Sequence, residues 1–168
     1  MKITTRQLAL CAVLTALALG LSTLENLFPV TLVIPLPGVK LGLANIVTVF
    51  ALYQLGPLPA LCILAARCLL GSLFAGNASA LLFSLLGGTL AMLVMLALSR
   101  LPGLSVYGVS IGGAAAHNIG QMAAALITLG NTAVLGYLPF LLVVSLFTGA
   151  LTGFVSALLL RAISHVKL

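Results

Sequence analysis

The sequence predicts an all-α integral membrane protein, a bundle of six transmembrane helices in a single domain at residues 1–168. Two features of the composition indicate this class: 62% of the 168 residues are hydrophobic and only 5% are charged. A soluble domain has charged residues at roughly a quarter of its positions. The third observation is the hydropathy pattern, in which six apolar segments follow one another with short breaks. Because one span takes about 20 residues, the chain has room for at most about seven.

Glycine, proline, asparagine and charged residues divide the chain into its apolar segments. We place the helices near residues 7–27, 40–55, 58–76, 78–99, 107–130 and 137–162. The first follows Lys2 and Arg6 and imitates a signal peptide, but its length and the later spans predict a retained helix. The second is the shortest, and the sequence GPLP at residues 56–59 turns it into the third. The breaks at residues 76–77 and 100–103 are also short, so neighbouring helices should be antiparallel.

The connection at residues 28–39, FPVTLVIPLPGV, is the longest loop and is unusually apolar. Its three prolines exclude a regular helix, and non-helical backbone cannot face lipid at membrane depth. We therefore expect this segment to fold over one end of the bundle. It is either a lid that closes over a bound molecule or a plug that only caps the core.

The charged residues predict the orientation of the bundle. With six spans, five basic residues lie on the side of the two termini: Lys2, Arg6, Arg100, Arg161 and Lys167. The opposite side keeps only Lys40 and Glu25. Since cytoplasmic loops carry the excess of lysine and arginine, both termini are expected in the cytoplasm.

The residue inventory excludes several classes of function. Glu25 is the only acid and the chain has no aspartate, which excludes the paired carboxylates of Mg²⁺-diphosphate and Walker-B sites. A GxxxxGK phosphate loop is also missing. The scattered basic residues do not form a nucleic-acid surface, and Cys11, Cys62 and Cys68 lack metal-ligand spacing. We predict no enzyme activity, no catalytic residue, no metal and no cofactor.

Arg67 stands in the middle of the third predicted span. A charge at that depth costs at least about 2.5–3.5 kcal/mol, so the side chain should face the protein interior or an aqueous cavity. Its alternative role is structural, as the partner of Glu25 or of helix-end carbonyl groups. In the fifth span, His117 and Gln121 lie four residues apart and therefore on one helical face.

The predicted orientation brings a set of polar side chains into the outer half of the membrane: Lys40, Asn45, Arg67, His117 and Gln121. We predict that they converge on one cavity that opens outward. Two cations, amide donors and a helix N-terminus suit a small polar or anionic molecule as the substrate. Proton coupling through His117 is a weaker alternative, because the chain offers no intramembrane carboxylate to complete a relay.

Small residues predict where helices approach closely, because membrane helices associate through tight backbone contacts. Three stripes occur: Ala12, Ala16 and Gly20; Gly112, Ala116 and Gly120; and Gly149 with Gly153. Each stripe serves either packing inside the bundle, which is the simpler expectation, or contact with a partner helix.

Residues 37–48, PGVKLGLANIVT, together with the central Arg67 and the six-span hydropathy, resemble the Gx transporter family, which also carries the label heptaprenyl diphosphate synthase component I. That family is similar to the substrate-binding S components of energy-coupling factor (ECF) vitamin transporters. The resemblance implies a six-helix membrane subunit that works with a transmembrane coupling protein and two cytoplasmic ATPases. In S components an AxxxA pattern on the first helix contacts the coupling protein. Ala12 and Ala16 match that pattern, so for this stripe the resemblance favours the partner interface.

The two labels of the family predict different functions. A prenyl-elongating enzyme is expected to carry aspartate-rich metal motifs, which this chain lacks. The leading hypothesis is therefore an S-component-like subunit in the bacterial inner membrane that captures a small polar or anionic metabolite from outside. The alternative is a non-catalytic accessory component of isoprenoid or quinone biosynthesis or of extracellular electron transfer. Ion-coupled transport without partners is a third possibility.

Overall fold

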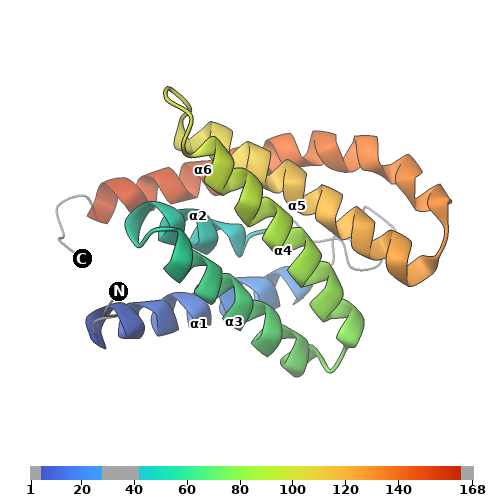
Figure 1. Ribbon diagram of the computed structural model, residues 1–168, viewed down its shortest axis with the longest axis horizontal. Coiled ribbons are helices and arrows are strands. Elements are labelled where there is room, and N and C mark those ends of the chain that lie inside the picture. The colour runs from blue at the N-terminus through green and yellow to red at the C-terminus, as the bar shows by residue number, and fades with distance from the viewer. Residues whose placement is uncertain (1–4, 28–41, 164–168) are drawn as a thin grey trace.

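The computed structural model describes residues 5–27 and 42–163, which form six α-helices and one 3₁₀-helix (Figure 1). The helices are α1 (Thr5–Leu27), α2 (Asn45–Gln54), α3 (Pro57–Ala75), α4 (Ala78–Leu98), α5 (Val106–Leu129), η2 (Thr132–Tyr137) and α6 (Leu138–Ile163). None of these described residues lies in a β-strand. The prediction of an all-α chain with six helices is confirmed. Lys40 and the predicted lid or plug at residues 28–39 lie outside the described residues.

The second helix differs most from its prediction. α2 has 10 residues and begins at Asn45, not near residue 40. Gly42 has a φ of 83°, which a right-handed helix cannot contain, and the Asn45 N–H donates to the Gly42 carbonyl at 2.8 Å in a tight turn. At 1.5 Å per residue, α2 is about 15 Å long, half of a hydrocarbon core of about 30 Å. By itself, this helix is too short to cross the membrane.

Four described segments are long and apolar enough to cross a membrane: Thr5–Glu25, Pro57–Ala75, Ala78–Leu98 and Thr132–Ile163. α5 has 24 residues but is not among them. Its buried residues include His117, Asn118 and Gln121. A helix enclosed by other helices contacts little lipid, so polar side chains that face the bundle interior are tolerated in it.

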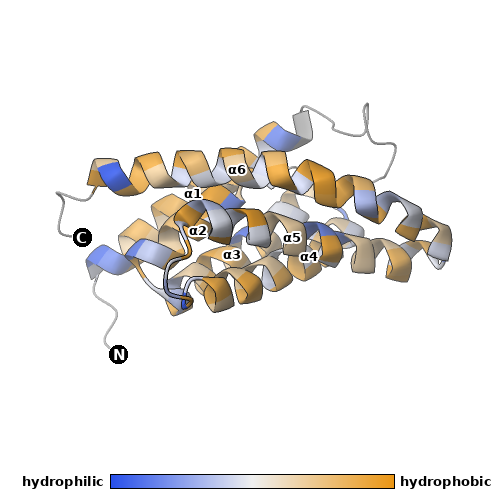
Figure 2. Cartoon of the chain, turned by 90° about the horizontal axis from the view of Figure 1, so that it is seen from above, coloured by the Kyte–Doolittle hydropathy of each residue, from blue (hydrophilic) through white to orange (hydrophobic). Residues whose placement is uncertain are grey.

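The helices alternate in direction between the two ends of the bundle. α1 begins and α6 ends at one end, where the α2–α3 and α4–α5 connections also lie (Figure 1). Figure 2 shows hydrophobic residues along most of α6 and hydrophilic residues where α1 begins and α6 ends. Arg6 in the first turn of α1, Arg161 in the last turn of α6 and Arg100 just after α4 therefore belong to the same end. We call it the arginine end.

Backbone-to-backbone contacts join α4, α5 and α6. A Cβ atom added at Gly120 would meet the backbone oxygen of Leu86 on α4. One added at Gly149 of α6 would lie 2.5 Å from the Cα atom of Ile111 on α5, and one at Gly153 would lie 3.1 Å from the α5 backbone. The internal packing role predicted for the small residues of α5 and α6 is confirmed.

Among the described residues, the stripe of small residues on α1 does not pack against another helix in this way. Ala12, Ala16 and Gly20 are exposed on the surface of the bundle, and a Cβ atom at Gly20 would meet nothing within 4 Å. α1 instead buries the face that carries Leu14 and Ala18. For this stripe the simpler expectation of internal packing is wrong, because α1 turns a different face toward its neighbours.

Candidate functional site

Arg67 lies on α3 and is buried, with 8% of its surface exposed. The helix that holds it begins at Pro57, whose missing N–H needs no acceptor in the first turn, and ends at Ala75, followed by the cap residue Gly76 in the left-handed conformation with φ 60°. The prediction that this arginine faces the protein interior or a cavity is confirmed. Its Nη2 donates to Oδ1 of Asn45 at 3.3 Å, and its Nε has no hydrogen-bond partner among the described residues.

The turn before α2 positions Asn45 and also binds Glu25. The Gly42 N–H donates to Oε1 of Glu25 at 2.5 Å, which ties the C-terminal part of α1 to the start of α2. Glu25 is 5% exposed. A Cβ atom at Gly42 would lie 3.0 Å from Nδ2 of Asn45, so a residue without a side chain is required here both by space and by the positive φ.

His117 and Gln121 reach the same region from α5. They are 5% and 1% exposed and lie against Gly87 of α4. A Cβ atom at Gly87 would come within 2.9 Å of Cε1 of His117 and 3.1 Å of Cγ of Gln121. Because Gly87 has no side chain, His117 and Gln121 can pack directly against α4 at this position. Asn118 points elsewhere and donates from Nδ2 to the Leu141 carbonyl on α6 at 2.8 Å, a structural role.

These side chains enclose a small polar cavity of about 20 Å³. It is lined by Ser22, Glu25, Gly42, Ala44, Arg67, Ser84, His117 and Gln121. A cavity of this size holds about one water molecule and excludes a metabolite. Four of the five predicted site residues thus meet at one place, since Asn45 bonds to Arg67 and the other three line the cavity. The fifth, Lys40, lies outside the described residues.

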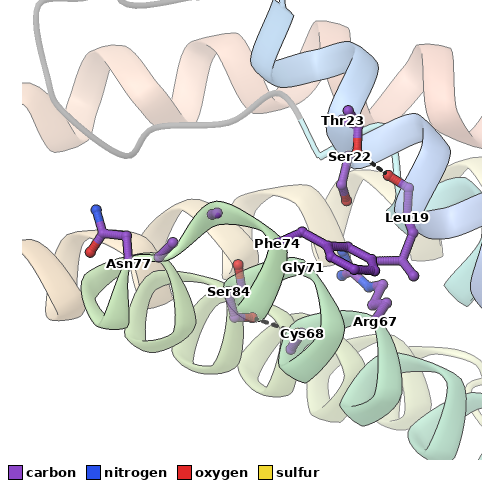
Figure 3. A pocket seen from close by; sticks show the side chains of 11 residues that line it. Leu19, Ser22, Thr23, Arg67, Cys68, Gly71, Phe74, Asn77 and Ser84 are labelled. Atoms are coloured by element: carbon purple, nitrogen blue, oxygen red, sulfur yellow. Dashed lines mark hydrogen bonds between the residues drawn. The ribbon is translucent and has the colours of Figure 1, made fainter.

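A larger cavity of about 370 Å³ adjoins the small one and lies between α1, α3 and α4 (Figure 3). Arg67, Ser22 and Ser84 line both cavities. The larger one extends to Phe74, whose ring is 80% exposed, and to Asn77 at the α3–α4 turn. Arg67 is therefore in contact with both a small polar cavity and a space large enough for a small molecule. We call the two spaces the inner and the outer cavity.

The described polar side chains that line the two cavities are mostly neutral hydrogen-bonding groups. Glu25 is the only carboxylate that lines either of them. Within the described part of the chain, no group of three or more histidine, cysteine, aspartate or glutamate side chains is placed to hold a metal ion. The donors present, a guanidinium, an amide and several hydroxyl groups, suit recognition of an oxygen-rich ligand.

The family model described as heptaprenyl diphosphate synthase component I matches residues 14–159. The chain belongs to this family. A search of curated proteins and a search of solved structures each give no match. The resemblance to the heptaprenyl diphosphate synthase component I label is confirmed, and the likeness to S components stays a prediction.

The part of the chain that matches the family model contains the candidate site residues. Both cavities lie within residues 14–159, as do Lys40 and Asn45. Of the two predicted interface residues, Ala16 lies inside the matched range and Ala12 just before it.

The predicted site omitted three residues whose polar side chains line the inner cavity: Ser22, Glu25 and Ser84. Glu25 had a signal in the sequence, because a buried arginine needs a counter-charge and the chain has a single acid. Ser22 and Ser84 had none, since serine occurs at many positions in these apolar helices. Their place at the site follows only from the way α1 and α4 pack around α3.

Proposed function

We propose that this protein is a non-enzymatic, substrate-binding subunit of a membrane transporter for a small polar or anionic metabolite. The observation that carries the proposal is Arg67, a charge buried in the middle of an apolar helix and placed between a polar cluster and an open cavity. An ionisable residue inside the membrane is costly and usually belongs to a functional pathway. A purely structural arginine would have its N–H groups satisfied by the protein, whereas Nε of Arg67 has no partner among the described residues.

The distribution of arginines supports an outward-facing site. If the arginine end is cytoplasmic, as the positive-inside rule implies, the α3–α4 turn lies on the external side. The outer cavity is lined by Asn77 of this turn and by the C-terminal halves of α1 and α3. A metabolite would then enter from outside the cell, across the bacterial inner membrane in which we place the protein.

Energy for transport would come from partner proteins, because the sequence has neither a phosphate loop nor aspartate. The partners we propose are an ECF-type transmembrane coupling protein and cytoplasmic ATPases. The exposed stripe of Ala12, Ala16 and Gly20 supports a coupling interface on α1, since small residues allow a partner helix to approach closely. The other two stripes are already used inside the bundle.

The family name favours a second candidate function. A component I of heptaprenyl diphosphate synthase would be an accessory membrane protein of isoprenoid or quinone biosynthesis, or of electron transfer that depends on these products. In that role Arg67 would be a structural residue and the outer cavity would bind no metabolite. The two functions therefore differ in whether a small molecule depends on Arg67.

The test is mass spectrometry of small molecules that co-purify with the wild-type protein, with Arg67→Ala and with the matched control Arg100→Ala. Arg100 is an exposed arginine in the α4–α5 connection, so its loss leaves the site intact. We expect one small molecule to be retained by the wild type and the control and lost from Arg67→Ala, while all three proteins insert into the membrane. A molecule retained equally by all three, or by none, would favour the accessory role.

A further inference from the structure

The outer cavity differs in charge from the inner one. Arg67 is the only cationic side chain among the described residues that line it, and no carboxylate lines it. Glu25 lies on the inner cavity only. A ligand in the outer cavity therefore meets the positive charge of Arg67 on a surface that carries no acid among the described residues, while Glu25 faces Arg67 from the inner cavity.

We infer that the outer cavity binds a small monocarboxylate whose carboxylate accepts from Arg67, an inference that rests on the proposed transport function. The Nε–H of Arg67 is buried and lacks a partner among the described residues, and an unsatisfied buried donor is costly. A carboxylate oxygen supplies the missing acceptor in a charge-assisted hydrogen bond. Among the described residues Arg67 is the single cation on this surface, so it balances one negative charge on the ligand.

The remaining wall of the outer cavity defines the rest of the ligand. Ser22, Thr23 and Ser84 offer hydroxyl groups near Arg67, while Leu19 and Phe74 are apolar. Figure 3 shows these side chains around one space. A volume of about 370 Å³ lies at the lower end of the range of roughly 300–1,000 Å³ for cavities that hold drug-sized molecules. The ligand is thus a compact carboxylate with oxygen or nitrogen groups on one side and an apolar face for Phe74.

The electrostatic part of this inference can be tested before the ligand is known, with thiol reagents of opposite charge. A single thiol is introduced by Ser22→Cys, at the junction of the two cavities, after Cys11→Ala, Cys62→Ala and Cys68→Ala. The probes are the anionic sulfonatoethyl and the cationic trimethylammonioethyl methanethiosulfonates, applied to purified protein in detergent. Each rate is compared with that of Ser79→Cys in the same background, a control at the exposed start of α4, outside both cavities.

The anionic reagent should be favoured by about tenfold at the Ser22→Cys thiol relative to the Ser79→Cys thiol, because one nearby unit charge attracts one reagent and repels the other. Arg67→Gln should abolish this preference. Arg67→Lys should keep most of it, which separates the effect of charge from a general disturbance of the fold. An equal ratio at the two thiols, or a preference that survives Arg67→Gln, would overturn the inference.

A second measurement addresses the apolar face of the ligand. Phe74→Ala should weaken stabilisation by benzoate, a monocarboxylate with one ring, in a thermal unfolding assay at millimolar concentration. Phe147→Ala is the matched control, because Phe147 is similarly exposed, at 73%, on α6 away from the cavity. Stabilisation by the neutral isostere benzamide equal to that by benzoate would contradict the charge requirement, even if transport itself were established. Loss of co-purifying metabolite in Arg67→Ala together with no anion preference would reject the monocarboxylate and leave the transport proposal standing.

Discussion

Gly87 provides a direct test of how the site is built, because its missing side chain leaves the room that His117 and Gln121 occupy. In Gly87→Ala the new Cβ atom would lie 2.9 Å from Cε1 of His117, 3.0 Å from its Nδ1 and 3.1 Å from Cγ of Gln121. Both side chains are buried, so neither can move into open space. The matched control is Gly20→Ala, also in the interior of an apolar helix, where the added atom meets nothing within 4 Å.

Both variants gain the helix propensity of alanine, but only Gly87→Ala also incurs the cost of overpacking. Replacing a helical glycine with alanine stabilises a helix by about 0.8–1.0 kcal/mol in both. Overpacking costs about 1–3 kcal/mol and applies only at Gly87. Because about 1 kcal/mol shifts the melting temperature of a chain of this length by roughly 2–4 °C, Gly87→Ala should melt about 2–12 °C below Gly20→Ala.

Thermal unfolding in detergent, followed by far-ultraviolet circular dichroism, measures this difference. A further variant identifies its cause: in a His117→Ala background the penalty of Gly87→Ala should shrink, because the two residues are coupled through one contact. Two results would contradict this packing: a melting temperature of Gly87→Ala equal to or above that of Gly20→Ala, or a penalty that is unchanged without His117. In either case His117 would not pack against α4 as described, and the described lining of the inner cavity would be incorrect.

The other predictions concern the α1 surface and the turn before α2. Ala12→Leu with Ala16→Leu should abolish co-purification with an ECF-type coupling protein and leave the melting temperature of the isolated subunit unchanged. The control Ala150→Leu, at an exposed position on α6, should preserve both the complex and the melting temperature. A complex that survives the double substitution on α1 would show that α1 is not the interface. Gly42→Ala should lower the melting temperature by several degrees, because a φ of 83° costs a side-chain-bearing residue about 1–2 kcal/mol. The control is Gly136→Ala in η2, which meets nothing within 4 Å, and equal melting of both variants would contradict the strained turn.

Much of the fold is predictable from local sequence, and the second helix shows where that approach fails. Hydropathy and helix-breaking residues predict where five of the long helices begin and end, since each depends on the residues of that segment alone. Residues 42–44 (Gly-Leu-Ala) lie within the predicted helix, yet the turn at Gly42 keeps these three residues out of it. That turn is stabilised by Glu25 from another helix, and no property of the local sequence reveals this contact.

The sequence by itself determined that this protein belongs in a membrane, that it is helical, and that Arg67 is its exceptional residue. These properties follow from the apolar length of each segment and the small number of charges, which do not depend on packing. Only the tertiary structure decided which small-residue stripe stays exposed, and which serines and which acid join Arg67. It also separated the site into a small inner cavity and a larger outer one. These outcomes depend on how closely the backbones of α1, α3, α4 and α5 approach one another. That distance is determined jointly by glycines on one helix and by the side chains that pack against them from another.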